Sequence, residues 1–124
     1  MVLVDSSSWI DYFQSGDEGH PIDDLLANNE LCTNDIILAE LIPSITHLKE
    51  RSLLGKLIAL NKFPLRIDWD RIVKMQILNL RSGINKVGIP DLLVAQNALE
   101  FDLQILSNDK HFALMAKVHG FKLY

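Results

Sequence analysis

The sequence predicts an α/β fold in which helices cover both faces of a short, mainly parallel sheet. Short apolar runs alternate along the chain with segments of helical periodicity, which is the pattern of a parallel sheet buried on both faces. The chain has 124 residues, and 48% of them are apolar. This length and composition suit one domain, residues 1–124, with one hydrophobic core.

The first third of the chain supplies two of the expected strands. Val2–Val4 form a short apolar run, and a short helix is expected to follow at residues 7–13. Gly16–Gly19 are predicted to form a loop, and a second short helix then runs through Leu26. The second strand is expected at Leu31–Thr33.

The middle of the chain is predicted to be mainly helical. Thr33 or Asn34 can cap a helix that starts near Asp35, and Pro43 is expected to kink or end that helix. A further helix is expected over residues 48–61, with several leucines on its inward face.

A third strand is expected at residues 63–67, between two helical segments. Asp68 or Asp70 then starts a long amphipathic helix. Gly83 and Gly88 bracket the loop that follows this helix.

The last third of the chain completes the alternation of helices and strands. A strongly apolar helix is expected over residues 90–100, and a fourth strand over Leu103–Leu106. A short helix at residues 109–117 and a last strand at residues 121–123 follow. In folds of this kind the ligand crevice lies beyond the carboxyl ends of the strands.

The bulk composition excludes several classes of protein. A net charge of −4 and a pI of about 5.4 argue against nonspecific duplex binding through a broad basic face. The single cysteine, Cys32, excludes an internal disulfide and a cysteine-based zinc site. We interpret Cys32 as a core residue, with a reactive thiol as the alternative. No apolar run approaches the roughly 20 residues that span a bilayer, and the N-terminal run meets a charge too soon for a secretory signal. We therefore expect a cytoplasmic protein without membrane association.

Four acidic residues lie where folding alone explains an acid poorly, because an acid beside core-forming residues is costly to bury without compensation. Two of them closely follow predicted strands, and the alternatives are a turn at the first strand and caps of the last two helices. One lies inside a helix, where capping cannot explain it and apolar neighbours leave little room for a polar face. In chain order the acids are Asp5, Glu40, Asp91 and Asp109.

Carboxylates from four parts of the chain, converging at one sheet edge, would hold a divalent cation. Mg²⁺ and Mn²⁺ prefer carboxylate and water oxygens. Such ions make water nucleophilic and relieve charge on a phosphate, which phosphodiester hydrolysis requires. The sequence contains no histidine pair with metal-ligand spacing and no glycine-rich phosphate loop.

Polar residues beside these acids are candidates for supporting roles. Ser7 and Asn108 can hydrogen-bond a carboxylate or a bound water, with a helix cap and a turn residue as the respective alternatives. His111 is the histidine nearest to the acids and is a candidate for substrate contact. The basic residues nearest to the motifs can hold RNA phosphates or else be solvated surface residues; they are Arg81, Lys86 and Lys110.

Four segments together resemble the PIN domain. They are residues 3–7, Glu40 within its apolar helix, residues 88–95 and residues 106–112. Their order and separations most resemble the VapC toxins of prokaryotic toxin–antitoxin pairs, and the likeness covers essentially the whole chain. Each segment alone is a weak signal, whereas four in order are fairly specific.

The resemblance implies a small three-layer α/β/α ribonuclease. In such a protein Asp5, Glu40, Asp91 and Asp109 would bind Mg²⁺ or Mn²⁺ and activate water, and Ser7 matches the family's small hydroxyl residue. The resemblance further implies a substrate that is RNA, often tRNA or another structured RNA. It also implies a homodimer and a cognate antitoxin that inserts a segment into the active-site groove.

Other classes of protein fit the sequence less well. A haloacid-dehalogenase-like phosphatase would need an aspartate at position 7, where Ser7 stands. A phosphoryl-accepting receiver domain would need an acidic pair at the first strand and an accepting aspartate after a central strand. The more serious alternatives are a PIN nuclease that works in RNA processing or on DNA without an antitoxin, and a catalytically silent PIN-like interaction module.

Overall fold

Short parallel strands form the centre of the fold. The computed structural model describes residues 1–15 and 19–124. Its strands are β1 (Val2–Val4), β2 (Leu31–Thr33), β3 (Asn61–Lys62), β4 (Gln104–Leu106) and β5 (Lys122–Leu123). Their order in the sheet is β3-β2-β1-β4-β5, and each neighbouring pair is parallel. The first strand of the chain is therefore the central strand of the sheet.

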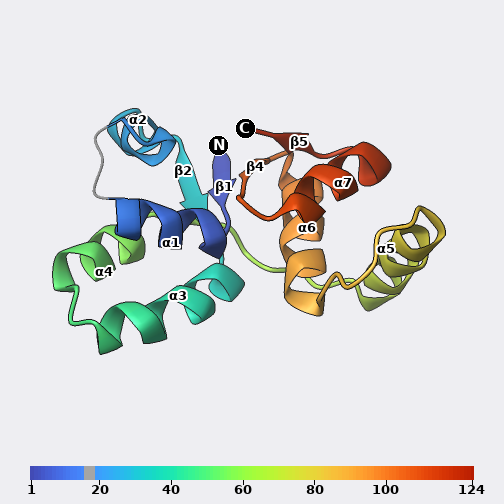
Figure 1. Ribbon diagram of the computed structural model, residues 1–124, viewed down its shortest axis with the longest axis horizontal. Helices are drawn as coiled ribbons and strands as arrows, with labels where there is room; N and C mark the ends of the chain where they lie inside the picture. Colours follow the sequence, from blue (N-terminus) through green and yellow to red (C-terminus); the bar gives the residue numbers. More distant parts are fainter. Residues whose placement is uncertain (16–18) are drawn as a thin grey trace.

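Helices cover both faces of this sheet. In the described residues they are α1 (Ser6–Ser15), α2 (Pro21–Ala27), α3 (Asp35–His47), α4 (Arg51–Ile58), α5 (Trp69–Arg81), α6 (Ile89–Phe101) and α7 (Lys110–His119). Figure 1 shows α1–α4 on one side of the sheet and α5–α7 on the other. The three-layer α/β fold predicted from the sequence is confirmed.

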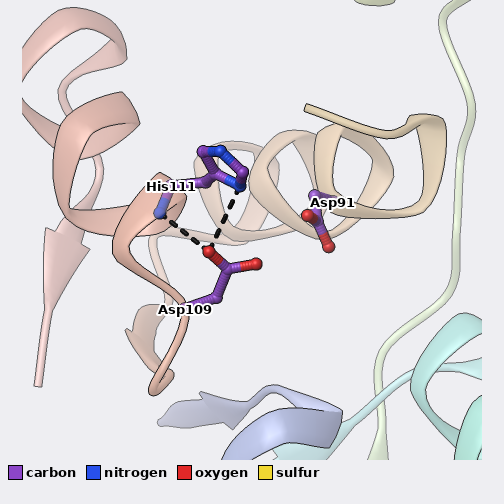
Figure 2. A group of neighbouring side chains, drawn as sticks. All are labelled: Asp91, Asp109 and His111. Atoms are coloured by element: carbon purple, nitrogen blue, oxygen red, sulfur yellow. Dashed lines mark hydrogen bonds and ion pairs between the residues drawn. The ribbon is translucent and has the colours of Figure 1, made fainter. Parts of the chain in front are cut away.

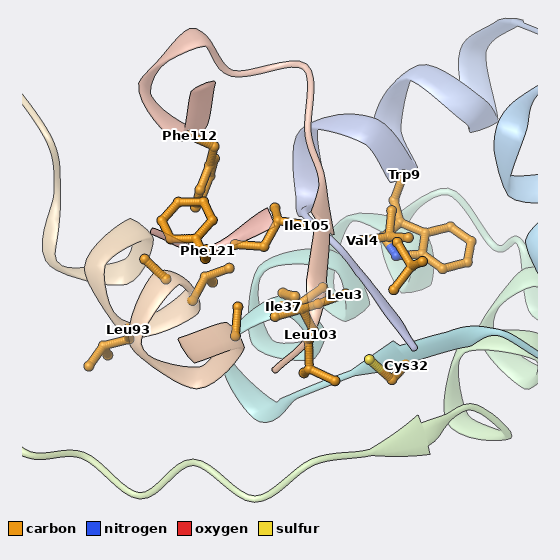
Figure 3. Packing of buried hydrophobic residues seen from close by; sticks show 14 of the residues in the cluster. Leu3, Val4, Trp9, Cys32, Ile37, Leu93, Leu103, Ile105, Phe112 and Phe121 are labelled. Atoms are coloured by element: carbon orange, nitrogen blue, oxygen red, sulfur yellow. The ribbon is translucent and has the colours of Figure 1, made fainter. Parts of the chain in front are cut away.

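The hydrophobic core surrounds the central strand. Leu3 and Val4 of β1 are completely buried, and buried aromatic side chains from α1 and α7, Trp9 and Phe112, belong to the same cluster (Figure 3). Cys32 of β2 also lies in this core, where burial raises the pKa of its thiol to about 12. Its interpretation as a core residue is confirmed.

A buried pair of amide side chains links the start of α3 to α6. Asn34 caps α3 by accepting a hydrogen bond from the backbone N–H of Ile37 at 3.0 Å. Its amide nitrogen donates to Asn97 of α6 at 2.9 Å, and Asn97 in turn donates to the carbonyl of Pro64 at 3.0 Å. Each of these buried polar groups is thus satisfied.

The third strand is shorter and earlier than predicted. β3 covers Asn61–Lys62, and the chain leaves the sheet after Phe63, whose N–H donates to the carbonyl of Thr33 at 2.9 Å. Pro64 follows and has no N–H to continue the ladder. The expected strand over residues 63–67 was therefore placed too late.

Two helix boundaries also differ from the sequence-based expectation. Pro43 does not end α3, which continues to His47 while its buried residues Leu41 and Ile45 remain packed in the core. The proline removes only one N–H from the helix, and packing offsets that loss. The helix expected over residues 48–61 is confined to Arg51–Ile58.

The loop predicted at Gly16–Gly19 falls largely outside the described residues, which omit residues 16–18. Within the described part of the chain, every helix is too short or too polar to cross a membrane.

Candidate active site

The carboxyl ends of β1 and β4 lie side by side and begin the site. Val4 pairs with Leu106 in the parallel ladder, and the backbone N–H of Asp5 donates to the carbonyl of Leu106 at 2.9 Å. This register sets the residues after β4 beside those after β1. The Asp5 side chain is only 4% exposed, so its charge must be compensated locally.

Two hydroxyl groups hold one oxygen of Asp5. Oγ of Ser7 lies 2.9 Å and Oγ of Ser107 lies 3.0 Å from Oδ2 of Asp5, and each can donate its proton there. Each hydroxyl also accepts a backbone N–H, from Asn108 at 3.1 Å and from Asp109 at 3.0 Å respectively. No described residue hydrogen-bonds the other oxygen, Oδ1. The network orients the carboxylate and leaves that oxygen available.

Asp91, Asp109 and His111 form the tightest group of potential metal ligands. One ligand atom from each residue can be chosen so that all lie within 4.8 Å of one another. Asp91 stands in the first turn of α6, and Asp109 is the N-cap of α7. Oδ1 of Asp109 accepts the backbone N–H of His111 at 2.9 Å and lies 3.2 Å from its Nδ1 (Figure 2).

Glu40 lies on an exposed face of α3. The buried residues of this helix are Ile37, Leu41 and Ile45, whereas Ala39 and Glu40 are exposed. The expectation that apolar neighbours leave little room for a polar face here was wrong, because the buried stripe of α3 is narrow. Oε2 of Glu40 is 3.4 Å from the hydroxyl of Ser6, the residue that follows Asp5.

The acids act on one another electrostatically. The pKa of Asp91 is raised from 3.8 to about 6, first by burial and then by the charges of Asp5, Asp109 and Glu40, while His111 opposes the rise. The pKa of Glu40 is also raised, by burial and by Asp5, against a hydrogen bond from Ser6. The structure thus brings the predicted acids close enough to repel one another, and His111 offsets part of that repulsion. Asp5 and Glu40 lie outside the tight group.

The other predicted site residues occupy less central positions. Asn108 is exposed, and its side chain accepts a hydrogen bond from Ser8 at 3.4 Å rather than from the acids. Lys110 is exposed beside the N-cap of α7. Arg81 ends α5 and Lys86 lies in the loop before α6, both with exposed side chains.

Ser107 lies beside Asp109 in the sequence, where a hydrogen bond to a carboxylate and a turn are both open to it, and the structure shows the hydrogen bond. Its hydroxyl contacts both Ser7 and Asp5 from the end of another strand, 100 and 102 residues away in sequence. The only sequence signal was its place between a strand and Asp109, which is also typical of a turn residue. His111 was considered for substrate contact and instead lies against Asp109.

The donor set fits a hard divalent cation. Carboxylate oxygens dominate it, their mutual repulsion is uncompensated, and Oδ1 of Asp5 remains available. Mg²⁺ and Mn²⁺ both meet these requirements, and the half-buried position of Asp91 and Asp109 leaves room for water ligands.

Comparison with known proteins agrees with this geometry. The sequence model of the PIN domain matches residues 2–118. Comparison with curated protein sequences gives no match. The chain is also similar to several solved structures. Their sequence identities to it are under 20%, so this similarity establishes the fold alone.

Several solved structures share the fold over nearly their whole length. One is a DNA-bound VapBC complex from Salmonella typhimurium, with a TM-score of 0.77 and 18% identity over 99% of this chain and 96% of that one. Another is VapBC2 from Rickettsia felis bound to a promoter DNA fragment, with a TM-score of 0.74 and 17% identity over 100% and 98%. A third is VapC20 from Mycobacterium tuberculosis, described as a sarcin–ricin loop cleaving toxin, with a TM-score of 0.62 and 16% identity over 92% and 94%.

Proposed function

This chain belongs to the PIN domain family, and from that premise we propose that it is a metal-dependent endoribonuclease, the toxin of a VapBC-like toxin–antitoxin pair. We further propose that residues 1–124 form a single PIN domain acting in the cytoplasm. The enzymatic part of the proposal is supported by four carboxylates that lie close enough to raise one another's pKa. They are Asp5, Glu40, Asp91 and Asp109. A silent interaction module has no need of such a costly arrangement.

The chain's own residues would divide the catalytic work as follows. Asp91 and Asp109 would hold the cation, and Asp5 and Glu40 would add further carboxylate ligands. When bound, Mg²⁺ or Mn²⁺ supplies the Lewis acidity that makes water nucleophilic and offsets charge on the scissile phosphate. Ser7 and Ser107 keep the carboxylate of Asp5 in one orientation.

Structured RNA, with tRNA as one candidate, is the substrate class that we propose. VapC20, which shares this fold, is described as cleaving the sarcin–ricin loop, which supports RNA as the substrate of this chain. The overall acidity of the protein makes local contacts more important than a broad basic face. Exposed cations can contact the RNA backbone, and the candidates are Arg81, Lys86 and Lys110.

A cognate antitoxin is the protein partner that we propose. Several structures that share this fold are complexes of the VapBC type. On this chain, α1 and α3 enclose a mainly apolar hollow of about 220 Å³. An apolar segment of an antitoxin would fill it, and the lining includes Ile10, Phe13, Leu41, Ile45 and Leu48.

A second copy of the chain is the other partner, and an exposed face of α5 supports it. Trp69, Val73, Ile77 and Leu80 follow one another at helical spacing, and each is between 42% and 59% exposed. The opposite face of α5 is buried in the core. An apolar stripe of this length on a soluble surface marks a contact site. Two antiparallel copies of α5 would bury the stripe against itself in a symmetric interface.

Cleavage of a mixed RNA pool with Mg²⁺ or Mn²⁺ tests the enzymatic proposal. We expect Asp5→Asn and Asp91→Asn to lower the cleavage rate on the order of 100-fold or more, because each removes a charged ligand while keeping the shape of the side chain. Asp102→Asn is the matched control, since Asp102 is exposed at the opposite end of α6 from Asp91. Its rate should equal that of the wild type.

Circular dichroism must show that the variants remain folded. A wild type that cleaves none of a broad set of RNAs with either metal would support the silent module instead. The toxin assignment has its own test: a small protein encoded next to this chain should bind it and inhibit cleavage. Cleavage without any such inhibitor would favour a nuclease of RNA processing.

A further inference from the structure

We propose that His111 supplies a nitrogen ligand to the cation site, so that the site prefers Mn²⁺ to Mg²⁺. The inference rests on the proposed function, because it concerns the same cation. It goes beyond that function by adding a ligand of a different chemical kind to the carboxylates and by fixing which ion the site favours.

The spacing of the three groups suits one shared ion. Ligand atoms of Asp91, Asp109 and His111 lie within 4.8 Å of one another. Around a cation with bonds of about 2.1 Å, neighbouring ligands are about 3 Å apart and opposite ligands about 4 Å apart. A small closing movement of these half-buried side chains would bring them to such separations.

The start of α7 directs the imidazole toward the acids. Asp109 caps the helix by accepting the backbone N–H of His111 at 2.9 Å, which fixes the two residues relative to each other. Nδ1 of His111 then lies 3.2 Å from the same Oδ1 of Asp109. Figure 2 shows the ring and both carboxylates gathered between α6 and α7.

An ion pair with Asp109 is the alternative role of His111, and chemistry separates the two roles. An ion pair requires a proton on Nδ1, whereas a metal ligand requires a lone pair there. In the metal-free protein the imidazole can donate to Asp109. In the tautomer with its proton on Nε2, the neutral ring would instead offer the lone pair of Nδ1 to a cation.

The other histidines have different surroundings. His20 contacts Asp11 at 3.0 Å, and His119 contacts Asn79 at 2.6 Å in a partly buried network behind the site. His47 is exposed at the end of α3. Among the described residues, the group of Asp91, Asp109 and His111 is the one with metal-ligand spacing.

A nitrogen ligand changes which cation a carboxylate site favours. Mg²⁺ is a hard ion that prefers oxygen ligands, whereas imidazole is a good ligand for first-row transition ions. A site made only of carboxylates would discriminate weakly between Mg²⁺ and Mn²⁺. Adding His111 should therefore strengthen the binding of Mn²⁺ more than that of Mg²⁺.

Calorimetric titration of the whole protein with MnCl₂ and with MgCl₂ provides the first test. We expect His111→Ala to weaken Mn²⁺ binding about tenfold and Mg²⁺ binding much less, so that the ratio of the two affinities falls. The backbone N–H that Asp109 accepts survives this substitution, so the cap of α7 is kept. His47→Ala is the matched control and should leave both affinities unchanged. Equal losses for both ions in His111→Ala would overturn the inference.

Pulsed electron paramagnetic resonance on the Mn²⁺-loaded protein provides the decisive test. A directly bound imidazole gives a ¹⁴N coupling to the manganese, which we expect in the wild type and in His47→Ala but not in His111→Ala. A Mn²⁺-loaded wild type without this coupling would overturn the His111 inference and leave the carboxylate site standing. Failure of both ions to bind would overturn the proposed metal-dependent function together with it.

Discussion

Asp91 carries a charge that the metal-free protein holds at a cost. Its pKa is raised from 3.8 to about 6 by burial and by the neighbouring carboxylates. A raised pKa means that the folded state binds the proton more tightly than the unfolded state does. The cost is therefore absent below pH 4 and fully present above pH 6.

Asp91→Asn should therefore stabilise the metal-free protein at neutral pH. A shift of about two units corresponds to about 3 kcal/mol, and partial exposure reduces the expected gain to about 1–2 kcal/mol. Urea unfolding in EDTA should show this gain at pH 7.5 and about a third of it at pH 4.5, between the unfolded and folded pKa values. Glu50→Gln, at an exposed position without a side-chain capping hydrogen bond, is the stability control and should show no gain at either pH.

Divalent cation should reverse the order of stability. The wild type would gain stability with the logarithm of the cation concentration once that concentration exceeds the dissociation constant, and the Asp91→Asn variant would gain much less. An Asn variant that is no more stable than the wild type in EDTA at pH 7.5 would mean that Asp91 is not strained by its neighbours.

The acids and Ser7 could be singled out from the sequence, whereas the contacts that bring Ser107 and His111 to those acids could not. An acid after an apolar strand or inside an apolar helix can be recognised from the sequence alone. Ser107 acts on Asp5 only because β1 and β4 pair in a particular register, and that register brings together residues about 100 apart. His111 gains its place from the cap of α7 by Asp109, a role that the sequence left open for this acid.

At the scale of elements, apolar periodicity predicted the strands and helices well where packing agrees with it. α6 is an apolar helix buried along most of its length, and its pattern left little ambiguity. β3 was misplaced because a proline, rather than hydrophobicity, decides where the chain leaves the sheet. Pro43 was overweighted because the buried side chains of α3 offset one missing hydrogen bond.

Two glycines should respond to alanine in opposite directions. Gly55 lies inside α4, and a Cβ built there meets nothing within 4 Å, so Gly55→Ala should stabilise the fold by about 0.5–1 kcal/mol through helix propensity. Gly120 ends α7 with a φ of +86°, so Gly120→Ala should cost about 1 kcal/mol. Thermal unfolding of both variants checks these signs. A destabilised Gly55→Ala would show that α4 needs flexibility at this position.

At the scale of the whole molecule, the topology creates the site. β1 is first in the chain but central in the sheet, between β2 and β4, so the residues that follow these strands meet at one edge. Alternating elements indicated a parallel sheet, but no local pattern states the order of its strands. Convergence of the acids was therefore an inference from general rules for α/β folds.

Charge placement on α5 favours an antiparallel pair of copies. Asp70 near the start and Arg81 at the end of the helix flank the same side of the apolar stripe, and both are exposed. Neither forms an ion pair with another described residue. With the stripes aligned antiparallel, Asp70 of each copy comes opposite Arg81 of the other, and the symmetry axis makes this contact twice.

Sedimentation velocity on the catalytically inactive Asp5→Asn protein should show a concentration-dependent dimer. Adding Val73→Glu should weaken dimerisation on the order of 100-fold, because a carboxylate would be buried in the apolar interface. Asp70→Arg or Arg81→Asp alone should weaken it about tenfold, since each creates two like-charge contacts. The double exchange should restore the dimer, because the opposite charges meet again with their positions reversed.

Leu114→Glu, on an exposed position of α7, is the control and should leave the dimer unchanged. If Val73→Glu instead leaves dimerisation intact but prevents binding of the antitoxin, the stripe on α5 belongs to that partner rather than to a second copy.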